Sequence, residues 1–467
     1  MPARISESSL LEGEDIIDLC SLVSINGFLP ARQPLKRLPH PYYQPWEHML
    51  DSLPTLLRQK TFRQEIDTLN ILTASRLDTE REWQRAYMIL SFLTHGYIWG
   101  GDAPSDVLPP CITVPFLQVS DHLDLPPVAT YSALNLWNFS STGRDFTDVD
   151  KLAALHTFSG TEDESWFFVL SVAIEARGAR IIPTMLRAID SIKHKDYEAV
   201  TRALNDMATC IGQLTPLLDR MFEKCDPMLF YHQLRPFLAG SKNMAAAGLP
   251  NGVFYDEGSG KGQWRQLRGG SNGQSSLLQF FDLVLGIDHA PTSHHQMPKG
   301  NSDAPKATPG EMNFYEEVGL RCRLTFMCII YANEPPVQVR LYMPKPHREF
   351  LMRVSRMDKI KDFVHSAPAF PSPAQQRLSQ AYKNAIEAFG NMRQAHIQMV
   401  TRYIIVPSRR PAPPSSFAVN LATTSMRSSK GVAKTLTGTG GTDLISFLRT
   451  ARDDTYGAGL VHRTSVS

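Results

Sequence analysis

The sequence predicts an all-α fold, and the spacing of its apolar residues is the main reason. Over residues 80–98, apolar side chains recur every three or four positions, at Trp83, Tyr87, Leu90, Leu93 and Tyr97. The same spacing returns over residues 197–223, at Val200, Leu204, Met207, Ile211, Leu214, Leu218 and Phe222. Positions three and four apart lie on one face of an α-helix, so each stretch predicts a helix with one buried face.

The composition is typical of a soluble globular protein. The chain has 467 residues, of which 42% are apolar and 20% charged, and its formal net charge is +2. This length suffices for two or three domains. Because lysine and arginine are scattered among carboxylates rather than gathered in a stripe, we expect neither nucleic acid nor a membrane surface as a partner.

The N-terminus and the cysteines favour a cytoplasmic protein. The first residues, MPARISESSLLEGEDIID, have no basic start followed by an apolar core, and no window approaches the roughly 18 apolar residues of a membrane span. The six cysteines contain no C-x-x-C pair. We therefore expect neither a disulfide framework nor a zinc site, and a reducing compartment fits this cysteine usage.

Proline-rich and polar stretches divide the chain. Residues 106–130 hold five prolines, which remove backbone donors and oppose both helix and strand. We interpret this stretch as the link between a smaller N-terminal domain and a larger C-terminal one. The polar stretches 288–311 and 408–437 are expected to be mobile loops.

His396 raises the first question about chemistry, because it lies in line with an apolar stripe. The stripe over 376–405 comprises Leu378, Tyr382, Ile386, Phe389, Met392, Met399 and Tyr403. One interpretation is a core histidine bonded to a carbonyl or a carboxylate. The other is an iron ligand, since a single histidine holds haem from its proximal side. Zinc is disfavoured, because no second histidine lies three or four residues away.

A glycine-rich stretch offers a second candidate. The sequence RGGSNGQSSLLQFFDLVLGI contains G-x-S-x-G around Ser271. In serine hydrolases a strand feeds this serine onto a strained turn before a helix. The preceding KGQWRQL carries no strand signal, so the alternative is a glycine-rich helix start capped by Ser271 or Ser275. The TGTGGTD stretch at 437–443 lacks the third glycine of a dinucleotide loop and is interpreted as a hinge or lid.

Two further stretches place single polar groups among apolar ones. In ESWFFVLSVAIEARG, Phe167 and Ser171 lie four residues apart and share a helix face. Ser171 is either bonded back to a backbone carbonyl or points where the aromatic ring points. In DPMLFYHQLRPFLAG, Arg235 lies near Phe230, where it either pairs with a carboxylate or receives an anionic ligand group.

Together these stretches resemble the indoleamine 2,3-dioxygenases, haem enzymes that open the indole ring of L-tryptophan with O2 to give N-formylkynurenine. The resemblance covers nearly the whole chain, in the family's order, through the blocks LDLPPVATYSALNLWNF, FFVLS, FYHQLRPFLAG, GGSNGQSSLLQFFDLVLGI, YMPKPHREFL, MRQAHIQMVTRYIIVP and GTGGTDLISFLR. It implies an all-α fold of two domains. A small N-terminal domain would span 1–158 and a large helical haem-binding domain 159–467, with a mobile loop at about 408–442.

The resemblance also implies which residues hold the haem b group. His396 matches the proximal ligand of the iron, Arg393 a partner of a haem propionate, and Asp282 a carboxylate near the haem. Three consecutive residues match the lining of the haem edge: Gly270, Ser271 and Asn272. Family members often have alanine where this chain has Asn272, so we expect a more polar pocket edge here.

On the other side of the haem, the resemblance places the substrate pocket. Three pairs of residues would line this pocket. Phe167 and Ser171 match residues above the iron, Tyr131 and Leu134 match the inner wall, and Thr439 and Gly440 match a loop that closes over the substrate. At the mouth, Arg235 would hold the substrate carboxylate and Phe230 would pack on the indole. No histidine base is evident there, so substrate orientation and water exclusion would be the main contributions of the protein.

The implied partners are L-tryptophan, O2 as co-substrate and an electron donor that reduces ferric haem. The chain would act as a monomer in tryptophan catabolism by the kynurenine pathway, which also serves NAD biosynthesis. Two alternatives stay open: an oxygen-binding haem protein of the same fold without catalysis, and a serine hydrolase at Ser271. Residues 318–338 have no counterpart in the family pattern and are either translated intron sequence or a lineage-specific insertion.

Overall fold

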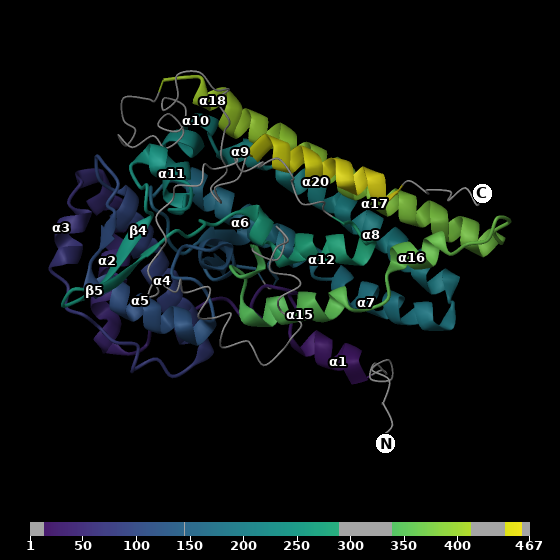
Figure 1. The fold of residues 1–467 in the computed structure, drawn as a ribbon, viewed down its shortest axis with the longest axis horizontal. Helices are drawn as coiled ribbons and strands as arrows, with labels where there is room; N and C mark the ends of the chain where they lie inside the picture. The colour runs from purple at the N-terminus through teal and green to yellow at the C-terminus, as the bar shows by residue number, and fades with distance from the viewer. Residues whose placement is uncertain (1–13, 144, 289–338, 412–443, 460–467) are drawn as a thin grey trace, which may run out of the picture.

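Helices make up most of the structure, which confirms the all-α prediction. The structure is a computed structural model that describes residues 14–143, 145–288, 339–411 and 444–459 (Figure 1). Its first half holds α1 (Glu14–Ser21), α2 (Gln44–Gln59), α3 (Phe62–Asp67), α4 (Glu80–Trp99), α5 (Pro110–Leu123), α6 (Glu162–Gly178), α7 (Ile181–Ser191), α8 (Tyr197–Asp219) and α9 (Met221–Lys224). The remainder holds α10 (Pro227–Leu229), α11 (Arg235–Leu238), α12 (Ser276–Leu285), α15 (Lys345–Ser355), α16 (Ile360–His365), α17 (Pro373–Val400), α18 (Val406–Ser408) and α20 (Leu444–Ala458).

The helix predicted over 80–98 is α4, and it is more deeply buried than its sequence pattern indicates. The Thr79 hydroxyl oxygen caps it by accepting a hydrogen bond from the Glu82 amide. Every residue from Arg85 to Trp99 is buried, so the expectation of one buried face is wrong here. Because α2, α5 and α11 all pack on α4, it is a central helix rather than a surface one.

The other two predicted helices lie side by side. Residues 197–223 form α8 and the short α9, while residues 376–405 form most of α17 and its continuation. The long helix α17 packs along α8 and α20 (Figure 1). A capping box starts α17, since the Ser372 hydroxyl oxygen accepts from the Gln375 amide and the Gln375 side chain accepts from the Ser372 amide.

Two small sheets interrupt the helical pattern. β1 (Val107–Leu108) pairs in parallel with β4 (Val253–Gly258), which pairs antiparallel with β5 (Lys261–Arg265), while β2 (Phe139–Ser141) pairs antiparallel with β3 (Leu152–Ala154). The expectation that KGQWRQL has no strand character is therefore wrong. Ser259 and Gly260 both have positive φ, at 55° and 75°, as a tight two-residue hairpin turn requires. Residues 261–265 therefore form a strand because this turn brings them beside β4, with which they pair.

The proline-rich stretch 106–130 is not a simple link, because it contains the 14-residue helix α5. Pro110 occupies the first turn, where its missing N–H has no helical partner to lose, and Pro115 removes one later hydrogen bond. Eight of the α5 side chains are buried, and this burial outweighs the lost bond. The prediction that these prolines oppose a helix is wrong.

Buried apolar side chains of both chain halves form one continuous core in the described structure. The N-terminal α1 packs on α7, whereas β4, from the second half of the chain, pairs with β1. The domain boundary that we predicted between residues 158 and 159 stays a prediction. Most of 288–311 and 408–437, and all of 318–338, lie outside the described residues, so the expectations for these segments are untested.

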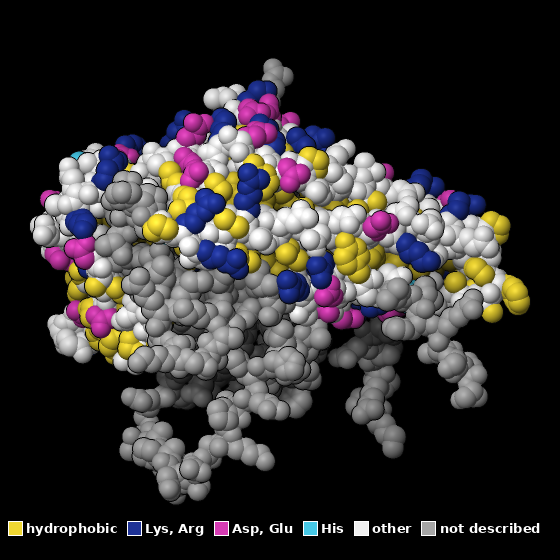
Figure 2. Space-filling view, turned by 90° about the horizontal axis from the view of Figure 1, so that it is seen from above, with side chains coloured by type: hydrophobic (Ala, Val, Ile, Leu, Met, Phe, Trp, Pro, Cys, Tyr) yellow, Lys and Arg dark blue, Asp and Glu magenta, His cyan; other side chains and the backbone are white. Residues whose placement is uncertain are grey.

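The described surface carries charges of both signs, and the described cysteines are not paired. On the face drawn in Figure 2, lysine and arginine side chains are interspersed with aspartate and glutamate side chains. Cys20, Cys111, Cys210 and Cys225 are free thiols. Across the described ranges, no helix has the length and apolar character needed to cross a membrane.

Candidate active site

The imidazole of His396 sits in the last third of α17, in line with the buried side chains as predicted. It is half-buried, and burial lowers the pKa of His396 to about 4, with the nearby Arg393 cation adding to this effect. The ring is therefore neutral at pH 7. Within the described ranges no hydrogen bond to this ring is formed, in contrast to the core histidine of the first interpretation. A neutral imidazole with both nitrogens left available fits an iron ligand.

One turn earlier, Arg393 ties α17 to two other helices. Its Nη2 donates to both carboxylate oxygens of Asp282 on α12, at 2.6 and 2.8 Å. Its Nη1 donates to the Ala451 carbonyl at 2.6 Å and to the Thr455 hydroxyl, both on α20. The Asp282 carboxylate thus helps to fix the position of the helix that carries His396, because it binds Arg393 on that helix. The role of Arg393 toward a haem propionate stays a prediction.

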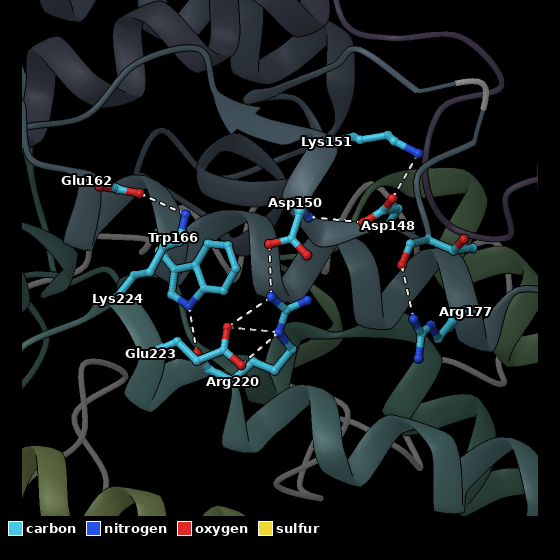
Figure 3. Close-up of polar contacts among 10 residues, drawn as sticks. Asp148, Asp150, Lys151, Glu162, Trp166, Arg177, Arg220, Glu223 and Lys224 are labelled. Carbon is cyan, nitrogen blue, oxygen red and sulfur yellow. Dashed lines mark hydrogen bonds and ion pairs between the residues drawn. The ribbon is translucent and has the colours of Figure 1, made fainter.

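Helix α6, which carries Phe167 and Ser171, is held at its N-terminal end by an ion pair and a hydrogen bond (Figure 3). Lys224 on α9 pairs with Glu162 of α6 at 2.9 Å. The indole N–H of Trp166 donates to the Arg220 carbonyl at 2.7 Å. These contacts hold α6 against the α8–α9 junction, just before the segment that carries Phe230.

Aromatic rings join the α6 segment to the continuation of α17. The Phe167 and Phe230 ring centroids lie 5.0 Å apart, and the Phe230 and Tyr403 centroids 5.6 Å apart, both with edge-to-face geometry. The Tyr403 hydroxyl donates to the carbonyls of Met221 and Cys225, at 3.0 and 2.8 Å. The two predicted pocket residues Phe167 and Phe230 are therefore in direct contact.

Arg235 is buried, with 6% of its surface exposed, and its guanidinium lies 5.5 Å from the centre of the Tyr231 ring. Burial lowers the pKa of Arg235. A buried guanidinium retains its charge, because the pKa of arginine is far above neutrality. Such a cation is suited to hold a carboxylate that enters the site.

The inner wall contains a buried hydrogen-bond network that sequence reasoning missed in part. Tyr131, which was predicted for the inner wall, is buried. The Tyr131 hydroxyl donates to Glu175 Oε1 at 3.1 Å, and Ser275 donates to the same oxygen at 2.6 Å. No motif marked Glu175, although its place one turn after Ser171 on α6 could have suggested a shared face.

The glycines of the GGS block allow close backbone packing. A side chain at Gly269 would meet the Leu238 carbonyl oxygen at 2.0 Å, and one at Gly270 would meet a Leu134 methyl group at 2.6 Å. Leu134 and Gly270, predicted for the inner wall and the haem edge, thus touch. Asn272 begins a short 3-10 turn (Asn272–Gln274) before α12.

The serine-hydrolase alternative is not supported by this geometry. Ser271 has φ −151°, which is relaxed extended backbone and not a strained turn. In the parts of the chain that are described, its hydroxyl bonds to no histidine. Ser275, not Ser271, caps α12 through the Leu278 amide, and Ser276 lies 3.1 Å from Nδ1 of His347. His347 of the YMPKPHREFL block therefore contacts Ser276 and not Ser271, and its ring lies 5.0 Å from that of Phe28.

Three π-helical turns in the described chain fall on the predicted site. They are η2 (Ser132–Leu136), η5 (Phe230–Leu234) and η8 (Thr401–Ile405). Each adjoins predicted site residues: Tyr131 and Leu134, Phe230 and Arg235, and the helix of His396. Such turns are rare and often occur at functional sites. Nothing in the sequence pattern distinguished them from ordinary helix.

Some predicted features are not tested by this geometry. Thr439 and Gly440 lie outside the described residues. Within those residues no group of three or more His, Cys, Asp or Glu side chains is arranged to hold a metal ion. A haem brings four nitrogen ligands of its own to the iron and therefore needs only one side chain of the protein as a ligand. The single histidine His396 would satisfy this need.

Comparison with known proteins gives the family. A family model described as indoleamine 2,3-dioxygenase matches residues 21–458. An indoleamine 2,3-dioxygenase of Aspergillus nanangensis is 37% identical over 442 residues, which cover 93% of this chain and 95% of that protein. One of Saccharomyces cerevisiae is 36% identical, over 92% of this chain and 90% of its own length. A 6-hydroxytryptophan 2,3-dioxygenase of Fusarium equiseti is 35% identical, over 92% and 94%. The chain therefore belongs to the indoleamine 2,3-dioxygenase family, whose members are oxidoreductases.

Proposed function

We propose that this chain is a haem-dependent dioxygenase that cleaves the C2–C3 bond of the L-tryptophan indole with O2 to give N-formylkynurenine. The observation that carries the proposal is the His396 imidazole, which is half-buried, neutral at pH 7 and without a hydrogen bond in the described structure. Haem held by this ring would supply the chemistry that lets O2 react with the indole. An electron donor would keep the iron ferrous.

The chain's own residues would bind and orient the substrate. Arg235 would hold the tryptophan carboxylate through charge-assisted hydrogen bonds, because it is a buried cation. The edge-to-face pair of Phe167 and Phe230 would confine the flat indole and exclude water. Ser171 would offer the ligand a single polar contact. Arg393, through Asp282 and α20, would fix the rotation of the helix that carries His396.

The buried Arg235 favours the enzyme over an oxygen-binding protein without catalysis. A site that only binds oxygen has no need for a cation that recognises a carboxylate. Loss of L-tryptophan binding on replacement of Arg235 would agree with this argument.

The test is haem binding and turnover by three proteins: the wild type, His396→Ala and the control Gln398→Ala, which alters an exposed residue of the same helix. Haem is titrated into each haem-free chain, and N-formylkynurenine is then followed after addition of L-tryptophan, O2 and a reductant. We expect a Soret band and product for the wild type and the control, and loss of both for His396→Ala. Wild-type haem binding without product would instead indicate the oxygen-binding alternative. Equal haem binding by all three proteins would contradict the ligand assignment.

A further inference from the structure

Tyr403 is a buried residue that links the helix of His396 to the predicted pocket wall. It follows His396 in the π-helical turn η8 that continues α17, and 2% of its surface is exposed. Its ring meets the Phe230 ring edge to face, with 5.6 Å between the centroids and 88° between the planes. Phe230 in turn contacts Phe167. Tyr403 thus stands between the helix that would hold the haem and the ring that would pack on the indole.

The Tyr403 hydroxyl holds the backbone that leads into Phe230. It donates to the Met221 carbonyl at 3.0 Å and to the Cys225 carbonyl at 2.8 Å. Met221 begins α9 and Cys225 follows its last residue, so both carbonyls belong to the segment that runs into η5 and Phe230. One O–H group serves two acceptors. Turning the Tyr403 ring would therefore take a donor from two carbonyls in a buried place, which costs free energy.

A further ring contact fixes the plane of the Tyr403 ring. The Phe222 ring, from α9, stacks on it with 5.6 Å between the centroids and 24° between the planes. The Arg402 guanidinium lies over the Phe222 ring, 4.3 Å from its centre, within the distance of a cation–π contact. Two consecutive residues of η8 thus hold Phe222. The Tyr403 ring is held at its hydroxyl and on a face, and it presents a defined surface to Phe230.

We propose that Tyr403 is a positioning residue for the substrate: through its hydroxyl and its ring it holds the Phe230 ring where the indole packs, at a fixed place relative to the helix of His396. This inference rests on the proposed function, since it assumes that the indole of tryptophan packs on Phe230. Tyr403 would act through Phe230 and not by contact with the ligand. Binding and orientation of the indole then depend on how firmly the Phe230 ring is held.

The first experiment compares Tyr403→Phe with a matched control on the same long helix, Tyr382→Phe. Tyr382 is 1% exposed, and its hydroxyl donates to the Leu285 carbonyl at 2.7 Å. Each substitution therefore keeps a buried ring and removes a buried hydroxyl. A merely structural role would lower the stability of both variants and leave the KM for L-tryptophan unchanged. The quantities measured are the KM and kcat for L-tryptophan and the dissociation constant for haem.

We expect Tyr403→Phe to raise the KM about 3- to 10-fold, the range of one net hydrogen bond, with kcat and the haem dissociation constant changed less than 2-fold. The control should change all three less than 2-fold. An unchanged KM in Tyr403→Phe, or an equal rise in the control, would overturn the proposal. A comparable loss of haem binding in Tyr403→Phe would also overturn it, because it would assign Tyr403 to the haem site.

The second experiment asks whether Tyr403 acts through Phe230. The KM for L-tryptophan is measured for Tyr403→Leu, Phe230→Leu and the double variant. If the effect of Tyr403 passes through Phe230, replacing Tyr403 in the Phe230→Leu background should change the KM less than 2-fold. Effects of the two substitutions that simply multiply would contradict this route.

A third measurement needs neither haem nor substrate. The wild type and the same three variants are unfolded in urea as haem-free chains, and the four folding equilibrium constants give the coupling between the two rings. An edge-to-face pair predicts a coupling of about 2- to 10-fold in that constant. Absence of coupling would show that Tyr403 does not hold Phe230. If the coupling is found but the haem-loaded wild type does not bind L-tryptophan, the proposed function fails, and the use of this contact for a substrate fails with it.

Discussion

The Arg393 guanidinium binds both oxygens of the Asp282 carboxylate, and this ion pair joins α17 to α12 three residues before His396. Both side chains are 16% exposed, so solvent screens the pair only in part. The same guanidinium reaches α20 through the Ala451 carbonyl. One arginine therefore sets the position of the helix on which haem binding would depend.

Replacement of Asp282 by alanine should destabilise the haem-free chain by about 1.5–3 kcal/mol, because a largely buried guanidinium would lose two charge-assisted hydrogen bonds. Urea unfolding at neutral pH measures the loss. The control is Glu349→Ala, which breaks a more exposed pair with Arg353 and should cost about 0–1 kcal/mol. Equal losses for the two variants would show that the Asp282 pair is no more than a surface contact.

Replacement of Arg235 by glutamine should lower kcat/KM for L-tryptophan about 10- to 100-fold, the range that corresponds to a hydrogen bond to a charged group. Tryptamine, which has the indole but no carboxylate, is the matched substrate and should lose less than about 3-fold. Arg235→Lys should lie in between, since lysine keeps the charge but not the two-pronged geometry. A similar loss for both substrates would mean that Arg235 supports the fold and not the carboxylate.

The sequence alone predicted the helices that carry the candidate site. The stripe through Leu378 and Phe389 located α17, and it placed His396 among core-facing side chains, as the structure has it. Spacing could not decide between a core histidine and an iron ligand, because that choice depends on hydrogen-bond partners from other elements. The family resemblance favours the iron ligand, and the comparisons confirmed the family.

The features that escaped prediction are those that depend on tertiary contacts. Strand β5 was missed because its pairing with β4, and not its own polar residues, determines it. Helix α5 was missed because burial outweighs the local effect of Pro115. Glu175 was missed because its two hydrogen-bond partners, Tyr131 and Ser275, are 144 residues apart in the sequence. No local pattern encodes such a convergence.

Acid should destabilise the protein through His95, a fully buried ring that bridges two segments. Its Nδ1 donates to the Phe237 carbonyl at 2.6 Å, and its Nε2 accepts from the Ala129 amide at 3.0 Å, so both nitrogens are committed in the neutral form. Burial lowers the pKa of His95 to about 4. Because the unfolded chain binds the proton more tightly, this group's contribution is present above about pH 6.5 and is lost as the pH falls toward 4.

The expected loss between pH 6.5 and 4 is on the order of 3 kcal/mol, since each pKa unit corresponds to about 1.4 kcal/mol. Replacing His95 with glutamine should flatten this part of the stability curve, because an amide offers one donor and one acceptor without titrating. The exposed His48→Gln is the control. Chemical denaturation at several pH values gives the curves. A wild-type slope retained in His95→Gln would assign the acid sensitivity to another group, such as His347, whose pKa burial lowers to about 3.

Residues 318–338 offer a prediction that requires no activity. We expect this stretch, VGLRCRLTFMCIIYANEPPVQ, to be absent from the native protein as translated intron sequence, because the blocks NFYEE and VRLYMPKPHREFL on either side resemble the family without it. A continuous β-prone run such as RLTFMCIIY would also be an aggregation hazard if exposed. Mass spectrometry of tryptic peptides from the natural source decides the question. A peptide that joins Glu317 directly to Val339 would confirm the prediction, whereas a peptide that reads through Phe326 would show a genuine insertion, which lies well before His396 and leaves the haem-binding proposal unaffected.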